Sequence, residues 1–159
     1  MPDVLTIGAH GWTAGAFFDA LARERVALIC DLRRRRGVRG PEYAFANSAR
    51  LQGRLAELRI AYAHRLDLAP SAGLRQAQYT VDEQHGVGKR DRVRLSPAFA
   101  AAYDAECLRG FDTAGFLAGL GGEGPICLFC VEREPAACHR SLVAARLAES
   151  GATVTHLVP

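Results

Sequence analysis

The sequence predicts a single α/β domain over residues 1–159, with a mainly parallel sheet of about five strands and helices on both faces. Short apolar runs alternate with amphipathic segments along most of the chain, which is the order that produces parallel strands joined by helices. Residues 26–30 are continuously apolar, as strands buried on both faces are. No repeat, low-complexity segment or linker divides the chain, so one three-layer domain is expected.

The first predicted strand, residues 4–8, is β-branched and ends at a glycine. Thr13 is a suitable N-cap for a helix that carries Phe17 and Leu21 on one face. The apolar run 26–30 is the second strand. These elements form the first strand–helix–strand unit of the predicted sheet.

The middle of the chain is less regular. A second helix, capped by Asn47 or Ser48, is predicted from the helical spacing of its leucines, and residues 60–64 form the third strand. Residues 66–95 show helical patches at best, so this stretch is expected to be largely irregular.

The last third of the chain returns to alternation between helices and strands. In order, the predicted elements are a helix from Ser96 and Pro97, a short helix 113–120, a strand 126–131, a helix 136–150 and a closing strand 152–158.

Composition is that of a soluble globular protein, with 49% hydrophobic and 23% charged residues and a net charge of +3. The apolar runs are far shorter than a bilayer span, and the N-terminus lacks the features of a signal peptide. We therefore expect a cytoplasmic protein that does not enter a membrane. The five cysteines are then expected to be reduced thiols rather than a disulfide framework.

Polar and reactive side chains follow the predicted parallel strands. In an open parallel sheet the loops after the strands lie along one edge, where ligands usually bind. The loops concerned carry His, Arg, Asp or Cys: residues 8–12, 31–39, 64–65 and 132–140. The sequence therefore predicts a ligand site at the carboxyl edge of the sheet.

Cys138 is the first candidate catalytic residue, as nucleophile or metal ligand. It is expected in the first turn of the last helix, after Pro135, where the helix dipole favours a thiolate. His139 is adjacent but should point about 100° away around the helix, so it is not expected to act as a base on Cys138. We expect Arg33 to line the same pocket as Cys138.

Cys127 and Cys130 form a C-x-x-C motif inside an apolar run. On a strand, residues three apart face opposite sides, so the pair cannot chelate one metal without a turn, and Cys127 is expected in the core. Cys130, at the strand end, could instead join Cys138 and His139 around a metal ion.

Arginines dominate the loop after the second strand: residues 33–54 hold seven arginines and one acidic residue. Asp31, at the end of that strand, is expected to orient an arginine, and Arg33 lies on the same side of the strand. Because a guanidinium suits phosphate or carboxylate, Arg33, Arg36 and Arg39 are candidate ligands of an anion.

Two further positions complete the candidate site. Glu132 resembles Asp31 in its placement after a strand, and Arg140, a further candidate anion ligand, is its expected partner. Glu132 and Asp31 are candidate catalytic groups that orient arginines or move protons. His10, in the glycine-flanked loop after the first strand, could contact a ring or a phosphate.

Several of these segments together resemble a family known as domain of unknown function 488. The resemblance covers nearly the whole chain, and it implies an α/β domain with a shared site but no particular reaction. The matching segments are Thr6-Ile7-Gly8, Asp31-Leu32-Arg33, Cys130-x-Glu132-x-x-Pro135-x-x-Cys138-His139-Arg140 and Val154-Thr155-His156.

Three functional hypotheses follow. The first is an enzyme whose pocket holds an anion, such as a nucleotide, a phosphorylated metabolite or a nucleic-acid end. The second is a non-catalytic nucleic-acid-binding module that uses the basic segment 33–54. The third is a zinc or iron site built from Cys130, Cys138 and His139.

Overall fold

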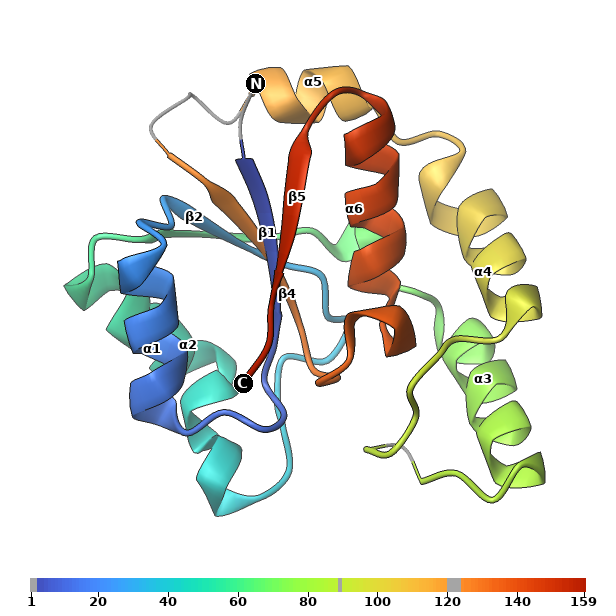
Figure 1. Cartoon of the computed structure of the whole chain (residues 1–159). Coiled ribbons are helices and arrows are strands. Elements are labelled where there is room, and N and C mark those ends of the chain that lie inside the picture. Colours follow the sequence, from blue (N-terminus) through green and yellow to red (C-terminus); the bar gives the residue numbers. More distant parts are fainter. Residues whose placement is uncertain (1–2, 89, 120–123) are drawn as a thin grey trace.

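The sheet has five parallel strands, and this confirms the predicted fold class. In the computed structural model, which describes residues 3–88, 90–119 and 124–159, the spatial strand order is β3-β2-β4-β1-β5 (Figure 1). Every neighbouring pair is parallel. The strands are β1 Asp3–Gly8, β2 Leu28–Asp31, β3 Ala61–His64, β4 Ile126–Cys130 and β5 Thr153–Leu157.

Helices cover both faces of this sheet. The α1 and α2 helices lie on one face, and α6 lies on the other with α4 and α3 outside it (Figure 1). The helices are α1 Ala14–Arg23, α2 Ser48–Glu57, α3 Ala72–Gln84, α4 Pro97–Tyr103, α5 Thr113–Ala118 and α6 His139–Glu149. The expected end of the short helix at residue 120 lies outside the described residues. Within the described ranges, no helix has both the length and the apolarity that a membrane crossing requires.

Two apolar cores, one on each face, hold the layers together. Strand β4 contributes to both, because its side chains alternate: Cys127 and Phe129 pack with α1 and α2, while Leu128 packs with α4 and α6. The same alternation directs Cys130 away from Cys127. Cys127 is fully buried, so the expectation that it belongs to the core is confirmed.

The segment 66–95 differs from its prediction, because it contains α3, a 13-residue helix. Ser71 caps this helix by accepting a hydrogen bond from the Leu74 amide. Its fully buried positions are polar, Gln78 and Asp82, so the apolar periodicity that marks most surface helices is missing. The polar residues pair with each other and with the segment that follows.

The N-cap side chains expected from their residue types form the capping hydrogen bond at two helices, but not at a third. Thr13 accepts from the Ala16 amide, and Ser96 accepts from the Phe99 amide, as N-caps do. Asn47 is the N-cap of α2, but its side chain accepts from the Val38 amide of the preceding loop instead.

The last helix also begins later than predicted. Residues Pro135–Ala137 form a 3-10 turn, Cys138 is extended at the N-cap, and α6 starts at His139. This displacement of the helix start by three residues changes the direction in which Cys138 points.

Candidate functional site

The site is a cavity of about 70 Å³ at the carboxyl ends of β2 and β4. It is enclosed by the loop after β2, by α3 and α4, and by the segment that joins β4 to α6. Arg33 and Cys138 both line it, as expected from the sequence. The placement agrees with the general rule that open parallel sheets bind ligands outside the carboxyl ends of their strands.

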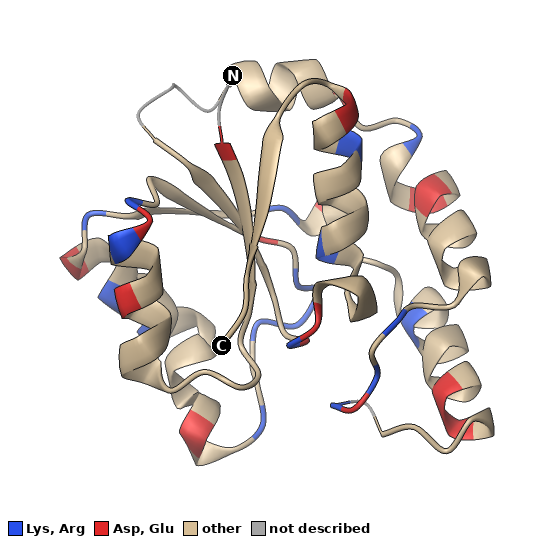
Figure 2. Cartoon of the chain, viewed as in Figure 1, with Lys and Arg blue, Asp and Glu red and all other residues tan. Residues whose placement is uncertain are grey.

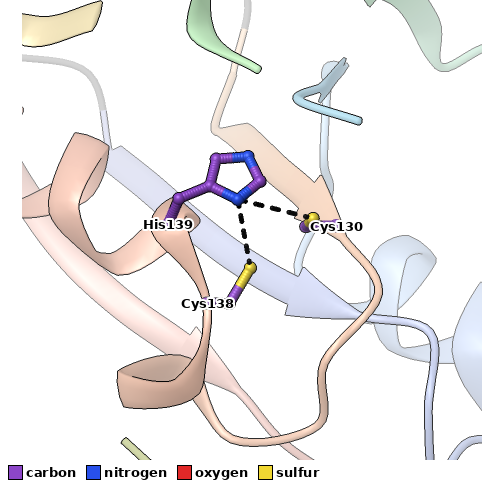
Figure 3. Close-up of side chains that lie close together, drawn as sticks. All are labelled: Cys130, Cys138 and His139. Atoms are coloured by element: carbon purple, nitrogen blue, oxygen red, sulfur yellow. Dashed lines mark hydrogen bonds between the residues drawn. The ribbon is translucent and has the colours of Figure 1, made fainter. Parts of the chain in front are cut away.

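Two thiols and an imidazole form a compact cluster in the cavity wall (Figure 3). The Nδ1 atom of His139 lies 3.9 Å from the Sγ atom of Cys130 and 3.9 Å from the Sγ atom of Cys138. All three residues are buried, and their three donor atoms lie within 4.8 Å of one another. Cys130 comes from the end of β4, whereas Cys138 and His139 come from the start of α6.

The close approach of Cys138 and His139 corrects the sequence-based expectation. That expectation placed both residues in a helical turn, about 100° apart. Cys138 instead has extended backbone angles, φ −131° and ψ 143°, so the helical rotation does not apply between it and His139. The imidazole therefore faces the neighbouring thiol.

The ring of His139 is held from its other side. Its Nε2 atom lies 2.9 Å from the carbonyl oxygen of Leu32, in the loop after β2, and Tyr103 packs against the ring with centroids 5.5 Å apart. A carbonyl oxygen can only accept a hydrogen bond, so Nε2 carries a proton. In the neutral ring, Nδ1 then presents its lone pair to the two thiols.

The cluster shifts the protonation of its members in opposite directions. Burial opposes the Cys138 thiolate, but the hydrogen bond from Cys130 and the positive charge of Arg140 hold the pKa of Cys138 well below its ordinary value. The pKa of Cys130 is raised by its hydrogen bond to Cys138 and by burial. Burial lowers the pKa of His139, but the charge of Cys138 and its hydrogen bond to His139, together with the charge of Glu132 and the hydrogen bond to the Leu32 carbonyl, more than offset it, so this pKa is raised.

Glu132 lies in the same cavity wall, and Arg92 holds it. The Oε1 atom of Glu132 is 3.1 Å from Nη2 of Arg92, whose Nη1 is 2.7 Å from Oδ2 of Asp82. The Oε2 atom of Glu132 is buried and has no hydrogen-bond partner among the described residues. Burial and the charge of Cys138 raise the pKa of Glu132 to about 7.

The expected pairing of Glu132 with Arg140 is wrong. Arg140 is fully buried, and its Nη1 donates to the backbone carbonyl of Glu132 rather than to the carboxylate, at 2.6 Å. Its Nη2 donates to the carbonyl of Arg133, and its Nε donates to Thr6 in β1. Arg140 thus ties the β4–α6 segment to the sheet, outside the cavity.

Asp31 and Arg33 form a buried ion pair at the end of β2. Nε and Nη2 of Arg33 each lie 2.9 Å from one carboxylate oxygen of Asp31, and Tyr62 donates to the same carboxylate at 2.7 Å. Nη1 of Arg33 donates to the carbonyl of Ala46. Asp31 orients Arg33 as the sequence indicates, but the pair neutralises the charge, and Asp31 does not line the cavity.

Three other candidate residues lie outside the cavity. Arg36 and Arg39 are exposed; Arg36 reaches the Tyr62 hydroxyl, and the carbonyl of Arg39 accepts from Arg90. His10 stacks obliquely on Tyr43 with ring centroids 5.0 Å apart. The anion-binding roles predicted for these residues therefore have no support from a shared cavity with Cys138.

The cavity is also lined by four arginines that were not among the candidates predicted from the sequence. These are Arg34, Arg35, Arg75 and Arg92. The first two adjoin Arg33 in the basic loop, where the sequence does not distinguish one arginine from the next. The other two come from the 66–95 segment, which carries no motif.

The fold and the cavity define an α/β protein with a cysteine–histidine cluster at the carboxyl edge of a parallel sheet. The family described as domain of unknown function DUF488 matches residues 13–147, and the chain belongs to that family. No curated protein and no solved structure matches the chain.

Proposed function

We propose that this protein is a metal-dependent enzyme that acts on a small anionic molecule, with a zinc-type ion held by Cys130, Cys138 and His139. One observation carries the proposal: a single imidazole nitrogen faces two thiol sulfurs at equal distances of 3.9 Å. Two thiols and an imidazole are donors that zinc prefers.

The spacing suits tetrahedral coordination. With zinc–sulfur bonds of about 2.3 Å and zinc–nitrogen bonds of about 2.0–2.1 Å, a tetrahedral site separates sulfur from nitrogen by about 3.6 Å. The two observed separations exceed this value by only a few tenths of an ångström. A small rotation of the side chains would bring the three donors into contact with one ion.

The surroundings of His139 also suit a metal ligand. A ligating histidine commonly donates its second ring N–H to a carbonyl or carboxylate, which fixes the tautomer and the ring orientation. Here Nε2 donates to the Leu32 carbonyl, and Nδ1 is left for the metal. The lowered pKa of Cys138 favours the thiolate form that a metal binds.

The cluster resembles a catalytic site more than a structural one. Structural zinc sites have four protein ligands, whereas catalytic sites have three and an open position. Among the described residues, only three offer donors to this cluster, and all three line the cavity. Zinc with an open position acts as a Lewis acid on a substrate oxygen. Glu132 is the one carboxyl group among the described residues that line the cavity, and its Oε2 has no described hydrogen-bond partner, so Glu132 is the candidate for proton transfer.

The charges around the cavity favour an anionic substrate. Five arginines line it against one acidic residue, Glu132. The nucleic-acid-binding alternative has less support, because Arg33 is buried and basic and acidic residues are interspersed over the molecule (Figure 2). Arg54, at the end of the basic segment, forms an ion pair with Glu57.

Metal analysis of the purified chain tests this proposal. The wild-type protein, isolated without chelators, should contain about one zinc or iron ion per chain, and Cys130→Ala and Cys138→Ala should lose it. Cys127→Ala is the matched control, because Cys127 is a buried cysteine on the same strand but faces the opposite core. If the wild-type protein is folded but contains no metal, the proposal of a metal centre is wrong, and Cys138 remains a candidate only as a thiolate nucleophile.

A further inference from the structure

Five guanidiniums line the cavity, but two of them are already neutralised. Arg33 is paired with Asp31, and Arg92 is paired with Asp82 and Glu132. These ion pairs are buried, and they leave neither guanidinium with an unbalanced charge to offer a ligand. The charge that can act on a bound molecule therefore comes from the other three: Arg34, Arg35 and Arg75.

None of these three arginines forms an ion pair with a carboxylate in the described part of the chain. Arg34 donates from Nε to the carbonyl of Pro70 and from Nη2 to the carbonyl of Ala69. Arg75 donates from Nη2 to the Tyr79 hydroxyl, and its guanidinium lies over the Tyr79 ring at 5.9 Å. These partners are neutral, so they fix the direction of two guanidiniums without cancelling their charge.

The three arginines come from two separate segments. Arg34 and Arg35 are in the loop after β2, and Arg75 is on the first turns of α3. They line one cavity because the loop and α3 lie side by side. Arg34 links the two segments by donating to the carbonyls of Ala69 and Pro70, which precede α3. The charge of Glu106 also acts on Arg34, but no carboxylate of the described residues forms an ion pair with any of the three arginines, so together they keep a net positive charge that favours a bound anion.

We propose that Arg34, Arg35 and Arg75 form a subsite for the dianionic phosphoryl group of a small phosphate monoester. A phosphate monoester carries a charge of about −1.5 to −2 and three acceptor oxygens, which several guanidiniums can share, whereas a carboxylate has one charge and two oxygens. This assignment rests on the proposed function and names the class of its substrate. With the phosphoryl group at the three arginines, the rest of the substrate would face the cysteine–histidine cluster.

The size and the lining of the cavity limit the rest of the substrate. A volume of about 70 Å³ holds only a few water-sized positions, so it suits a phosphoryl group with a short organic body rather than a nucleotide. Pro70, Leu95 and Phe99 provide apolar contacts in the same wall. A polar reacting group at the cluster, a short body along these residues and a phosphoryl group at the arginines would occupy the cavity.

Calorimetric titration of the purified full-length chain with methyl phosphate tests the subsite. Arg35→Gln and Arg75→Gln should each weaken binding about tenfold or more, the effect of losing one charge-assisted contact. Arg109→Gln is the control, because this exposed arginine lies in none of the segments that line the cavity, and it should change affinity less than about twofold. Equal affinities in all three variants would overturn the proposal.

Two further probes define the ligand. Acetate should bind at least about tenfold more weakly than methyl phosphate, since it carries half the charge; equal binding would make the subsite a general anion site and contradict the assignment. Adenosine monophosphate should bind no more tightly than methyl phosphate. Much tighter binding of the nucleotide would contradict the size argument.

Metal content separates the failure of this proposal from the failure of the proposed function. If the wild-type chain holds no metal but methyl phosphate binding depends on Arg35 and Arg75, the subsite stands and the metal centre does not. If the metal is present but both variants bind methyl phosphate as the wild type does, the metal centre stands and the subsite does not. Loss of methyl phosphate binding on removal of the metal alone would place the phosphate on the metal and overturn the subsite.

Discussion

The imidazole of His139 faces the thiol of its sequence neighbour Cys138, with 3.9 Å between Nδ1 and Sγ. Adjacent residues inside a helix cannot meet in this way. The contact exists because the chain passes from an extended N-cap to the first helical residue between these two positions. This change of backbone conformation brings both side chains to Cys130 at the end of β4.

Gly8 should be required by the packing of β1 against the segment that follows β4. A Cβ atom at this position would lie only 1.8 Å from the carbonyl oxygen of Glu132, and that carbonyl accepts from Arg140. We expect Gly8→Ala to lower the free energy of unfolding by at least about 2 kcal/mol, measured by urea denaturation.

Gly53 in α2 provides the control for this prediction. Its added Cβ would meet nothing within 4 Å, so Gly53→Ala should raise stability by about 0.5–1 kcal/mol through helix propensity. A Gly8→Ala protein as stable as the wild type would show that the Glu132 carbonyl is not fixed there.

The ion pair between Arg92 and Asp82 should contribute strongly to holding residues 90–95 against α3. Both side chains are 6% exposed, and Nη1 lies 2.7 Å from Oδ2. Arg92→Met leaves a buried carboxylate without its partner and should cost about 3–5 kcal/mol of unfolding free energy. The double variant Asp82→Asn/Arg92→Met should cost less than the sum of the single variants, because the charge of Asp82, one of the two carboxylates that Arg92 pairs with, is gone. Additive effects in this cycle would argue against a direct interaction.

The fold was largely predictable from the sequence, since it depends on strong periodic signals. The run Ile126–Cys130 is apolar at every position, and Thr13 and Ser96 cap their helices as their residue types suggest. The α3 helix was missed because Gln78 and Asp82, its buried positions, are polar.

The site was predictable in place but not in detail. The rule for the carboxyl edge of a parallel sheet placed Cys138 and Arg33 correctly in one cavity. Which arginines carry free charge depends on tertiary partners such as Asp31, and Arg75 and Arg92 have no sequence motif. The direction of the Cys138 side chain depends on the residue at which α6 begins, and helix ends are the least certain feature of a sequence-based prediction.

His156 should make the protein less stable in mild acid. Partial burial of the ring and the charge of Arg140 lower its pKa in the folded state, while the unfolded chain keeps the ordinary value of 6.5. As the pH falls below that value, the unfolded state binds the proton first, so stability is lost down to the folded pKa. The Nδ1 atom of this ring lies 2.7 Å from the Thr6 hydroxyl.

Replacement of His156 tests that pH dependence. The difference in unfolding free energy between about pH 7.5 and about pH 5.5 should be smaller in His156→Gln than in the wild type. An unchanged difference would assign the acid sensitivity to another group, such as His10, whose pKa burial also lowers.

Removal of the proposed metal should destabilise the folded chain. Treatment with a strong chelator should lower the melting temperature, and added zinc should restore it, because a ligand that binds only the folded state raises stability. Cys127→Ala should show the same chelator-dependent shift as the wild type, whereas Cys138→Ala should show none. A shift in Cys138→Ala equal to that of the wild type would place the metal elsewhere.

X-ray absorption spectroscopy at the metal edge tests the central claim most directly. We predict two sulfur scatterers at about 2.3 Å together with nitrogen or oxygen scatterers at about 2.0–2.2 Å, from Cys130, Cys138, His139 and a fourth, exchangeable ligand. Cys138→Ala should remove one of the sulfurs if any metal remains. A metal shell of nitrogen and oxygen alone, or a folded chain with no metal, would contradict the account.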